Sequence, residues 1–142
     1  MCYDIIKDHE GFSEIAYKCP AGIWTYGYGS TTRPDGSPVK EGDTITKETA
    51  LALLTDYLIK NVYPVFTKIP YNLTNGQKQA IASLCYNIGT SAFTKSKLFK
   101  AICNKDVEGI FKNWDWIKGG GVVLKGLAKR RSHEMYLFLR DC

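Results

Sequence analysis

Three side chains near the N-terminus have types and a spacing that suit acid–base chemistry. Glu10 is followed nine positions later by Cys19, and Cys19 six positions later by Thr25. The apolar sequence neighbours of Glu10 are Ile5, Ile6, Phe12 and Ile15. A carboxyl group packed against apolar side chains keeps its proton to higher pH, and a protonated carboxyl can donate that proton to a glycosidic oxygen. The plainer alternative is a solvated glutamate, as most glutamates are.

The elements expected around these residues place Glu10 at a junction. Tyr3, Ile6 and Glu10 lie at helical spacing, and Gly11 follows where a helix end often needs a left-handed residue. Residues 15–32 mix aromatic and β-branched residues with glycine and proline, which predicts short strands joined by tight turns. Glu10 is therefore expected to end a helix directly before a small β-rich segment.

The rest of the chain shows helical periodicity. A helix is expected from Thr46, with Leu51, Leu54 and Leu58 on its apolar stripe and Pro64 beyond its end. The letters "TNGQ" at 74–77 form a capping box that opens a helix closed at Gly89. Further helical patterns cover residues 98–102, 107–114 and, after three glycines at 119–121, 124–139. Strands followed by helices predict the α+β class.

Size and composition limit the classes of protein to which the chain could belong. A chain of 142 residues that is 44% hydrophobic is expected to form a single domain over residues 1–142. No apolar run approaches the roughly 18 residues of a membrane span, and the N-terminus shows no export signal. The net charge of +5 favours polyanions such as wall polymers, anionic lipid or nucleic acid. Because the basic residues match no nucleic-acid motif, no nucleic-acid partner is expected.

The cysteines predict free thiols rather than a metal or cofactor site. They lie at positions 2, 19, 85, 103 and 142, with no CxxC pair and no histidine at metal spacing. An ordinary thiol is only a few per cent ionised at neutral pH, since its pKa is near 8.5. We therefore expect a neighbouring cation, with Lys18 as the candidate, to lower the pKa of Cys19 if this thiol takes part in chemistry.

Aromatic residues offer two further features. In "TYGYG" at 25–29 the glycines, Gly29 among them, would let a polymer approach the backbone, and Tyr26 and Tyr28 offer rings for sugar faces. The alternative is that these are ordinary hairpin residues. Trp114 is expected in the core, because it continues a stripe formed by Val107, Ile110 and Phe111.

The string from Glu10 to Gly29 resembles the phage-type lysozymes, the bacteriophage endolysins of glycoside hydrolase family 24. Their signature is Glu, eight residues, Asp or Cys, five residues and Thr, which falls here on Glu10, Cys19 and Thr25. The segment "LTNGQKQAIASLCYNIGTSAF" at 73–93 is similar to the central helix of the family, and "GGGVVLKGLAKRRSHEMYLF" to its C-terminal helix. The resemblance thus covers nearly the whole chain.

The resemblance implies a fold and a reaction. The fold would be lysozyme-like, with a small N-terminal β-hairpin lobe, a larger helical lobe and the active-site cleft between them. Glu10 would be the general acid for a β-1,4 bond between N-acetylmuramic acid and N-acetylglucosamine. Cys19 stands where Asp is usual and, with Thr25, would hold the attacking water in an inverting mechanism. Thr31 falls at a substrate-contact position, although threonine is not the usual residue there.

The resemblance also implies partners and alternatives. Arg130 or Arg131 would pair with Glu10, with surface solvation as the alternative for at least one of them. The substrate would be peptidoglycan glycan strands, and a holin would release a monomeric enzyme from the host cytoplasm to the wall. A lytic transglycosylase and a catalytically weak peptidoglycan-binding module remain alternatives, because the usual Asp is missing. Oxidation of Cys19, with Cys2 as the nearest thiol in sequence, is a further alternative role for that residue.

Overall fold

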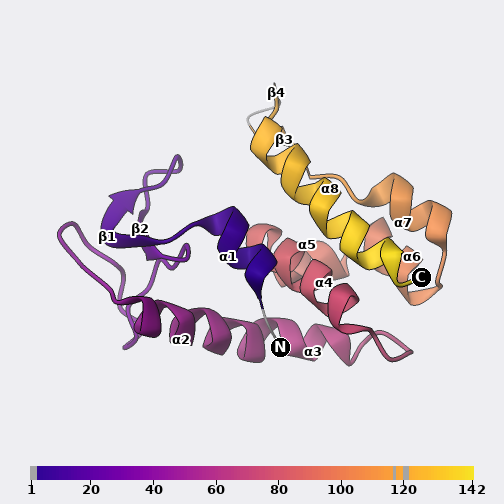
Figure 1. Cartoon of the computed structure of the whole chain (residues 1–142), viewed down its shortest axis with the longest axis horizontal. Coiled ribbons are helices and arrows are strands. Elements are labelled where there is room, and N and C mark those ends of the chain that lie inside the picture. Colours follow the sequence, from indigo (N-terminus) through magenta and orange to yellow (C-terminus); the bar gives the residue numbers. More distant parts are fainter. Residues whose placement is uncertain (1–2, 117, 120–121) are drawn as a thin grey trace. The chain divides into compact units, whose positions relative to one another are not determined.

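The computed structural model describes residues 3–116, 118–119 and 122–142, and the chain divides into two compact units (Figure 1). One unit spans Ile6–Lys60 and the other spans Asn61–Cys142 together with the N-terminal end up to Ile5. Cys2 and part of the glycine run at 119–121 lie outside the described residues. The expectation of a single domain over residues 1–142 stays a prediction, as does the expected cleft.

The Ile6–Lys60 unit begins within the helix that carries Glu10. Helix α1 (Asp4–Glu10) has an acidic residue in its first turn, which suits the positive end of the helix dipole. It ends at Glu10, as expected, because Gly11 adopts a left-handed φ of 70° and donates its N–H to the Lys7 carbonyl at 2.9 Å. Glu10 is therefore fixed at a helix terminus immediately before the first strand.

A two-stranded antiparallel sheet follows, formed by β1 (Ser13–Lys18) and β2 (Trp24–Gly27). In its register Tyr17 opposes Thr25 and Lys18 opposes Trp24. One face of the hairpin contributes Ala16 and Tyr26 to a buried cluster. The cluster also contains Val39, Ile45 and Ala50. The hairpin is thus anchored through one face only, and residues of the other face are available for a site.

Helix α2 (Lys47–Tyr57) covers this cluster, and its N-cap is Thr46, whose hydroxyl accepts the Thr49 N–H at 3.2 Å. Two details differ from the sequence prediction. Leu51 is 42% exposed, and Ala50 is buried in its place together with Leu54. Pro64 does not follow the helical run, because that run continues through the π-helical turn η1 (Leu58–Val62) into α3 (Tyr63–Phe66), whose first turn accommodates proline.

The Asn61–Cys142 unit is mostly helical. Besides α3 its elements are α4 (Asn75–Ile88), α5 (Thr90–Thr94), α6 (Lys97–Cys103), α7 (Val107–Asn113), β3 (Lys118–Gly119), β4 (Val122–Val123) and α8 (Lys125–Arg140). The predicted capping box is confirmed: the Thr74 hydroxyl accepts the Gln77 N–H, and the Gln77 side chain accepts the Thr74 N–H, both at 3.1 Å. Helix α4 is the central element, buried over much of its length and packed against α8.

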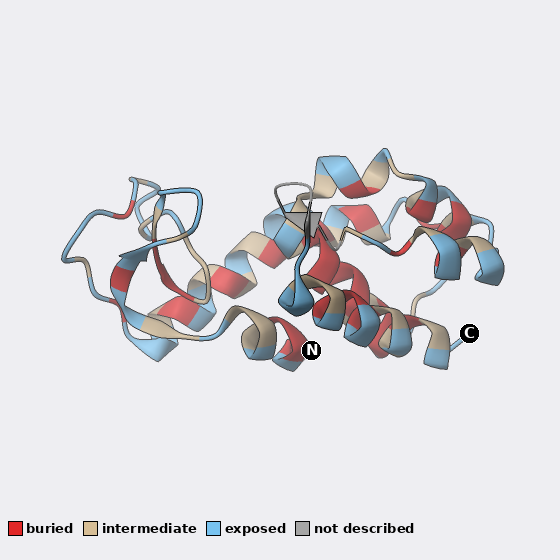
Figure 2. Cartoon of the chain, turned by 90° about the horizontal axis from the view of Figure 1, so that it is seen from above, coloured by how far each residue is buried: buried red, intermediate tan, exposed pale blue. Residues whose placement is uncertain are grey.

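Buried residues occur in both units (Figure 2). The hairpin β1–β2, followed by a mostly helical chain that also carries the short antiparallel pair β3–β4, confirms the α+β class. None of the helices in the described part of the chain has the length and apolar character needed to span a bilayer. The fold thus offers one exposed hairpin face, next to the end of α1, as the place to look for a site.

Candidate functional site

Cys19 and Thr25 come together at the end of the hairpin. The turn is closed by the Cys19 N–H bound to the Ile23 carbonyl at 2.9 Å and by the Gly22 N–H bound to the Cys19 carbonyl at 2.8 Å. Thr25 is only 4% exposed, and its hydroxyl donates to the Ile23 carbonyl at 3.0 Å. The tight turn therefore fixes both side chains relative to the same backbone.

This turn lowers the pKa of the Cys19 thiol. The largest cause is a hydrogen bond from the Ile23 N–H; burial, the next largest, acts in the opposite direction, and a hydrogen bond from the Ala21 N–H again favours the thiolate. Donors favour the thiolate because they stabilise its negative charge. The lowering agrees with expectation, but its cause is not Lys18, whose ammonium lies over the Trp24 ring at 5.5 Å from the centroid.

The other described cysteines have different environments. All four in the described part of the chain are free thiols. Burial raises the pKa of Cys85 to about 12 and also raises that of Cys103. Among these residues Cys19 stands out as a half-buried thiol whose surroundings favour the ionised form.

Glu10 lies within electrostatic reach of the same hairpin face. It is half-buried at the end of α1. The pKa of Tyr17 is raised first by burial and then by the negative charges of Glu10 and Cys19, so both groups lie near this phenol. Tyr17 was not among the residues predicted from the sequence. It lies two residues before Cys19, near the end of an expected strand, and this spacing, which places alternate side chains on one face, is the signal that could have found it.

The predicted substrate-binding residues occupy the segment after β2. Tyr28 is half-buried against the cluster below the hairpin, with its ring 5.4 Å from that of Phe12. Gly29 has a φ of 94° in a turn closed by two backbone hydrogen bonds between Tyr26 and Ser30. Thr31 is exposed, and its carbonyl accepts the Val39 N–H at 3.1 Å. Their roles stay predictions.

One aromatic prediction is wrong, and another is right for a different reason. The Tyr26 ring is buried in the cluster and cannot face a sugar. Trp114 is buried, as expected, but the stripe used to predict this is wrong, because Val107 and Phe111 are 52% and 62% exposed. Trp114 is held instead by packing on Phe138, at 5.5 Å between ring centroids, and by a hydrogen bond from its indole nitrogen.

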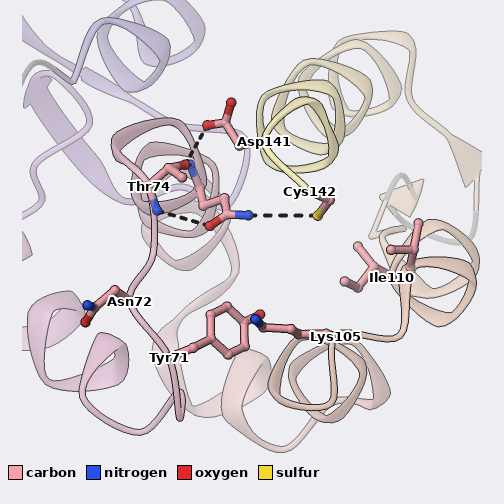
Figure 3. A pocket seen from close by; sticks show the side chains of 9 residues that line it. Tyr71, Asn72, Thr74, Lys105, Ile110, Asp141 and Cys142 are labelled. Carbon is pink, nitrogen blue, oxygen red and sulfur yellow. Dashed lines mark hydrogen bonds between the residues drawn. The ribbon is translucent and has the colours of Figure 1, made fainter.

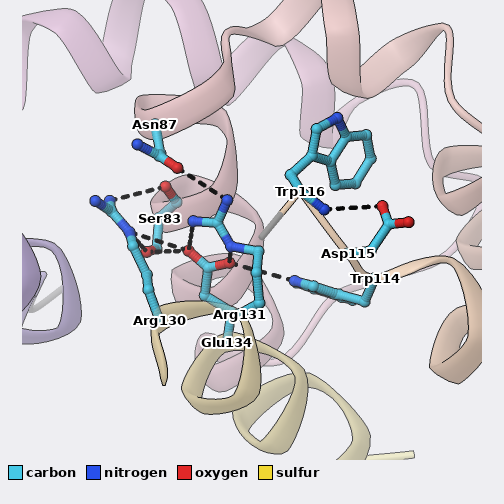
Figure 4. Close-up of polar contacts among 8 residues, drawn as sticks. All are labelled: Ser83, Asn87, Trp114, Asp115, Trp116, Arg130, Arg131 and Glu134. Carbon is cyan, nitrogen blue, oxygen red and sulfur yellow. Dashed lines mark hydrogen bonds and ion pairs between the residues drawn. The ribbon is translucent and has the colours of Figure 1, made fainter. Parts of the chain in front are cut away.

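Arg130 and Arg131 lie in a buried ion cluster, which also contains Ser83 and Glu134 (Figure 4). The Glu134 carboxylate, with no exposed surface, lies 2.7 Å from Arg131 Nε and 3.4 Å from Arg130 Nε. It also accepts hydrogen bonds from the Ser83 hydroxyl and the Trp114 indole. The surface alternative is therefore wrong for both arginines, while pairing of either with Glu10 stays a prediction.

A cavity of about 380 Å³ in the Asn61–Cys142 unit contains none of the predicted site residues. Its polar groups bind one another (Figure 3): the Thr74 hydroxyl donates to Asp141 at 2.5 Å, and the Gln77 amide donates to the Cys142 sulfur at 3.8 Å. Lys105 lies over the Tyr71 ring at 4.5 Å from its centroid. The two hydrogen bonds join the start of α4 to the end of α8. No group of three or more potential metal ligands occurs among the residues that the structure describes.

Comparison with known proteins identifies the class. The phage lysozyme family model matches residues 7–134, and the chain belongs to this family, a class of glycoside hydrolase. The endolysin of Acyrthosiphon pisum secondary endosymbiont phage 1 is 40% identical over 139 residues, which cover 94% of this chain and 92% of the relative. The endolysin of Salmonella phage P22 is 33% identical over 136 residues, with coverage of 94% and 92%.

Solved structures agree with this membership. An endolysin from Escherichia coli O157:H7 phage FAHEc1 is 34% identical, with a TM-score of 0.87 over 99% of this chain and 91% of that chain. The muramidase domain of SpmX from Asticaccaulis excentricus is 33% identical, with a TM-score of 0.81 over 96% and 93%. The lysozyme-like α+β fold is therefore confirmed.

Proposed function

We propose that this phage lysozyme is an endolysin muramidase that hydrolyses the β-1,4 bond between N-acetylmuramic acid and N-acetylglucosamine in bacterial peptidoglycan, for host cell lysis. The observation that carries the proposal is the placement of Cys19 at the hairpin turn and of Thr25 in the adjoining strand β2, with Glu10 close enough for its charge to affect the same hairpin face. Family membership over residues 7–134 and endolysin relatives support the substrate class.

In the proposed reaction Glu10 donates one proton and Cys19 accepts one. Glu10 donates its proton to the leaving glycosidic oxygen as the bond to the anomeric carbon breaks. The Cys19 thiolate accepts a proton from the water that attacks this carbon, and Thr25 helps to hold that water. An inverting reaction needs the acid and the base far enough apart to admit the water, about 6.5–9.5 Å when both are carboxylates. Solvent exchange then restores both groups.

A turbidity assay on purified peptidoglycan tests the role of Glu10. Glu10→Gln removes the transferable proton but keeps the shape of the side chain, so clearing is expected to slow by about 10²–10⁴-fold. Glu14→Gln is the matched control, because Glu14 is an exposed residue of β1 and is expected to leave the rate unchanged. Equal clearing by both variants would remove Glu10 from the mechanism.

The chemistry of the products separates hydrolysis from transglycosylation. Hydrolysis leaves reducing N-acetylmuramic acid ends, whereas a lytic transglycosylase closes an anhydro ring with a hydroxyl of the substrate itself. Mass spectrometry of digested wall fragments is expected to show reducing ends. Anhydro ends would contradict the proposed water attack. Continued binding to glycan without any cleavage would instead support a binding module.

We also propose that the protein starts in the host cytoplasm and reaches the wall as a monomer after a holin opens the membrane. The endolysin relatives support the destination at the wall. Expression in a bacterial host with and without a holin gene tests the route: lysis is expected only with the holin. Lysis without it would contradict this route of release, and sedimentation analysis reads the oligomeric state.

A further inference from the structure

Tyr17 lies on the same hairpin face as Cys19 and Thr25. Tyr17 in β1 directly opposes Thr25 in β2, and opposed residues of antiparallel strands share a face. Side chains alternate along a strand, and the pairing continues through the bond between the Cys19 N–H and the Ile23 carbonyl. Cys19 therefore follows Tyr17 on this face, while Ala16 and Tyr26 point to the buried cluster on the other.

Exposure indicates that Tyr17 covers part of the site while remaining accessible. Thr25 is 4% exposed although it faces away from the buried cluster, so neighbouring side chains must cover it. Its strand partner Tyr17 is 41% exposed. One side of the Tyr17 ring can thus lie over Thr25 while the other side meets solvent or substrate.

The hydroxyl of Tyr17 is a proton donor near both reacting groups. The negative charges of Glu10 and Cys19, after burial, raise the pKa of Tyr17, so the phenol keeps its proton in the neutral range. A protonated phenol donates one hydrogen bond and can do so without losing its proton. Water in the site can therefore donate to the Cys19 thiolate, accept from Tyr17 and keep a lone pair for attack.

We propose that Tyr17 is a positioning residue of the glycosidase reaction: its hydroxyl donates a hydrogen bond that orients the attacking water, and its ring shields Thr25 and Cys19 from bulk solvent. This inference rests on the proposed function. Tyr17 keeps its proton throughout, and the proton balance between Glu10 and Cys19 is unchanged.

Two variants separate the hydroxyl from the ring. Tyr17→Phe keeps the ring, so on soluble peptidoglycan fragments kcat is expected to fall about tenfold, as for one lost hydrogen bond, while KM stays within twofold. Tyr17→Ala opens the face, so iodoacetamide is expected to alkylate Cys19 several times faster than in the wild type, as read by peptide mass mapping. Tyr136→Phe is the control for kcat, because it removes the same hydroxyl from an exposed tyrosine of α8, which belongs to the other unit.

The outcomes distinguish this inference from the proposed function. If Tyr17→Phe keeps the wild-type kcat, or if Tyr17→Ala leaves the alkylation rate of Cys19 unchanged, the positioning role is overturned. A fall in kcat that Tyr136→Phe shows equally overturns it as well. Full activity of Glu10→Gln, by contrast, overturns the proposed function whatever Tyr17 does. Thermal melting of each variant, read by circular dichroism, confirms that folded protein is being compared.

Discussion

Cys19 can stand where a carboxylate is usual because its turn supplies hydrogen-bond donors to sulfur. The N–H groups of Ile23 and Ala21 favour the thiolate over the thiol. A carboxylate needs no such help, since an ordinary Asp is ionised above about pH 4. The hairpin turn therefore has a chemical task here in addition to its structural one.

This difference predicts a pH dependence. The thiolate fraction rises with pH and, because the pKa of Cys19 is lowered, rises below the ordinary thiol value of about 8.5. The ratio of the wild-type rate to the Cys19→Asp rate is therefore expected to increase from pH 5 to 8, since the aspartate is already ionised. Because both proteins share all other ionisable groups, the effect of those groups on the rate cancels in this ratio. Turbidity assays across this range measure it.

Two further variants complete that experiment. Cys19→Ser is expected to lose about 10²-fold or more in rate, because a hydroxyl is a far weaker base than a thiolate. Cys142→Ser changes an exposed thiol in the other unit and is expected to keep the wild-type profile. A ratio that does not change with pH would show that Cys19 does not act as the base.

At the level of the hairpin, one glycine of "TYGYG" is needed for packing. Gly27 has a φ of 62°, and an added Cβ would come within 3.0 Å of the Ala50 Cβ in α2. Gly27→Ala is therefore expected to lower the free energy of unfolding by about 2 kcal/mol or more, from backbone strain and overpacking together. Urea denaturation measures the loss.

Gly36→Ala is the matched control for that substitution. Gly36 also has a positive φ, of 87°, but a Cβ there would meet no atom within 4 Å. Only the backbone strain applies, so the expected loss is about 1 kcal/mol. Equal losses at the two positions would show that contact with Ala50 is not important.

Short sequence motifs predicted where helices and strands lie, whereas tertiary packing determines which residues of each helix are buried. Gly11 and the box at 74–77 determine helix ends through their own backbone and side-chain bonds, so sequence revealed both. The burial of Ala50 instead of Leu51 depends on where the hairpin lies against α2, which periodicity does not contain. Likewise, the motif named Glu10, Cys19 and Thr25, but only strand register brought Tyr17 beside them.

Breaking the buried ion cluster is expected to destabilise the Asn61–Cys142 unit strongly, because it would leave buried charge without a partner. Glu134→Gln would leave Arg130 and Arg131 buried without the carboxylate that they share. Removing one partner of a buried ion pair costs about 3–5 kcal/mol, so a loss of this size in the free energy of unfolding is expected. Chemical denaturation monitored by circular dichroism provides the measurement.

An exposed ion pair supplies the control for this substitution. Glu108 lies 2.7 Å from Lys112 on α7, with both side chains mostly exposed. Glu108→Gln is expected to cost less than about 0.5 kcal/mol, because water screens such pairs. Similar losses in the free energy of unfolding for the two variants would show that burial does not increase the cost of breaking the ion cluster.

The three tryptophans are divided between the two compact units, which gives each unit its own fluorescent reporter. Trp24 belongs to Ile6–Lys60, whereas Trp114 and Trp116 belong to Asn61–Cys142. Trp24 is half-buried under Lys18, and Trp114 is buried against Phe138, so unfolding changes the surroundings of both indoles. Emission from a Trp24→Phe variant reads the Asn61–Cys142 unit alone, and emission from a double variant with Trp114→Phe and Trp116→Phe reads the Ile6–Lys60 unit alone. A shared midpoint is what a single cooperative domain requires.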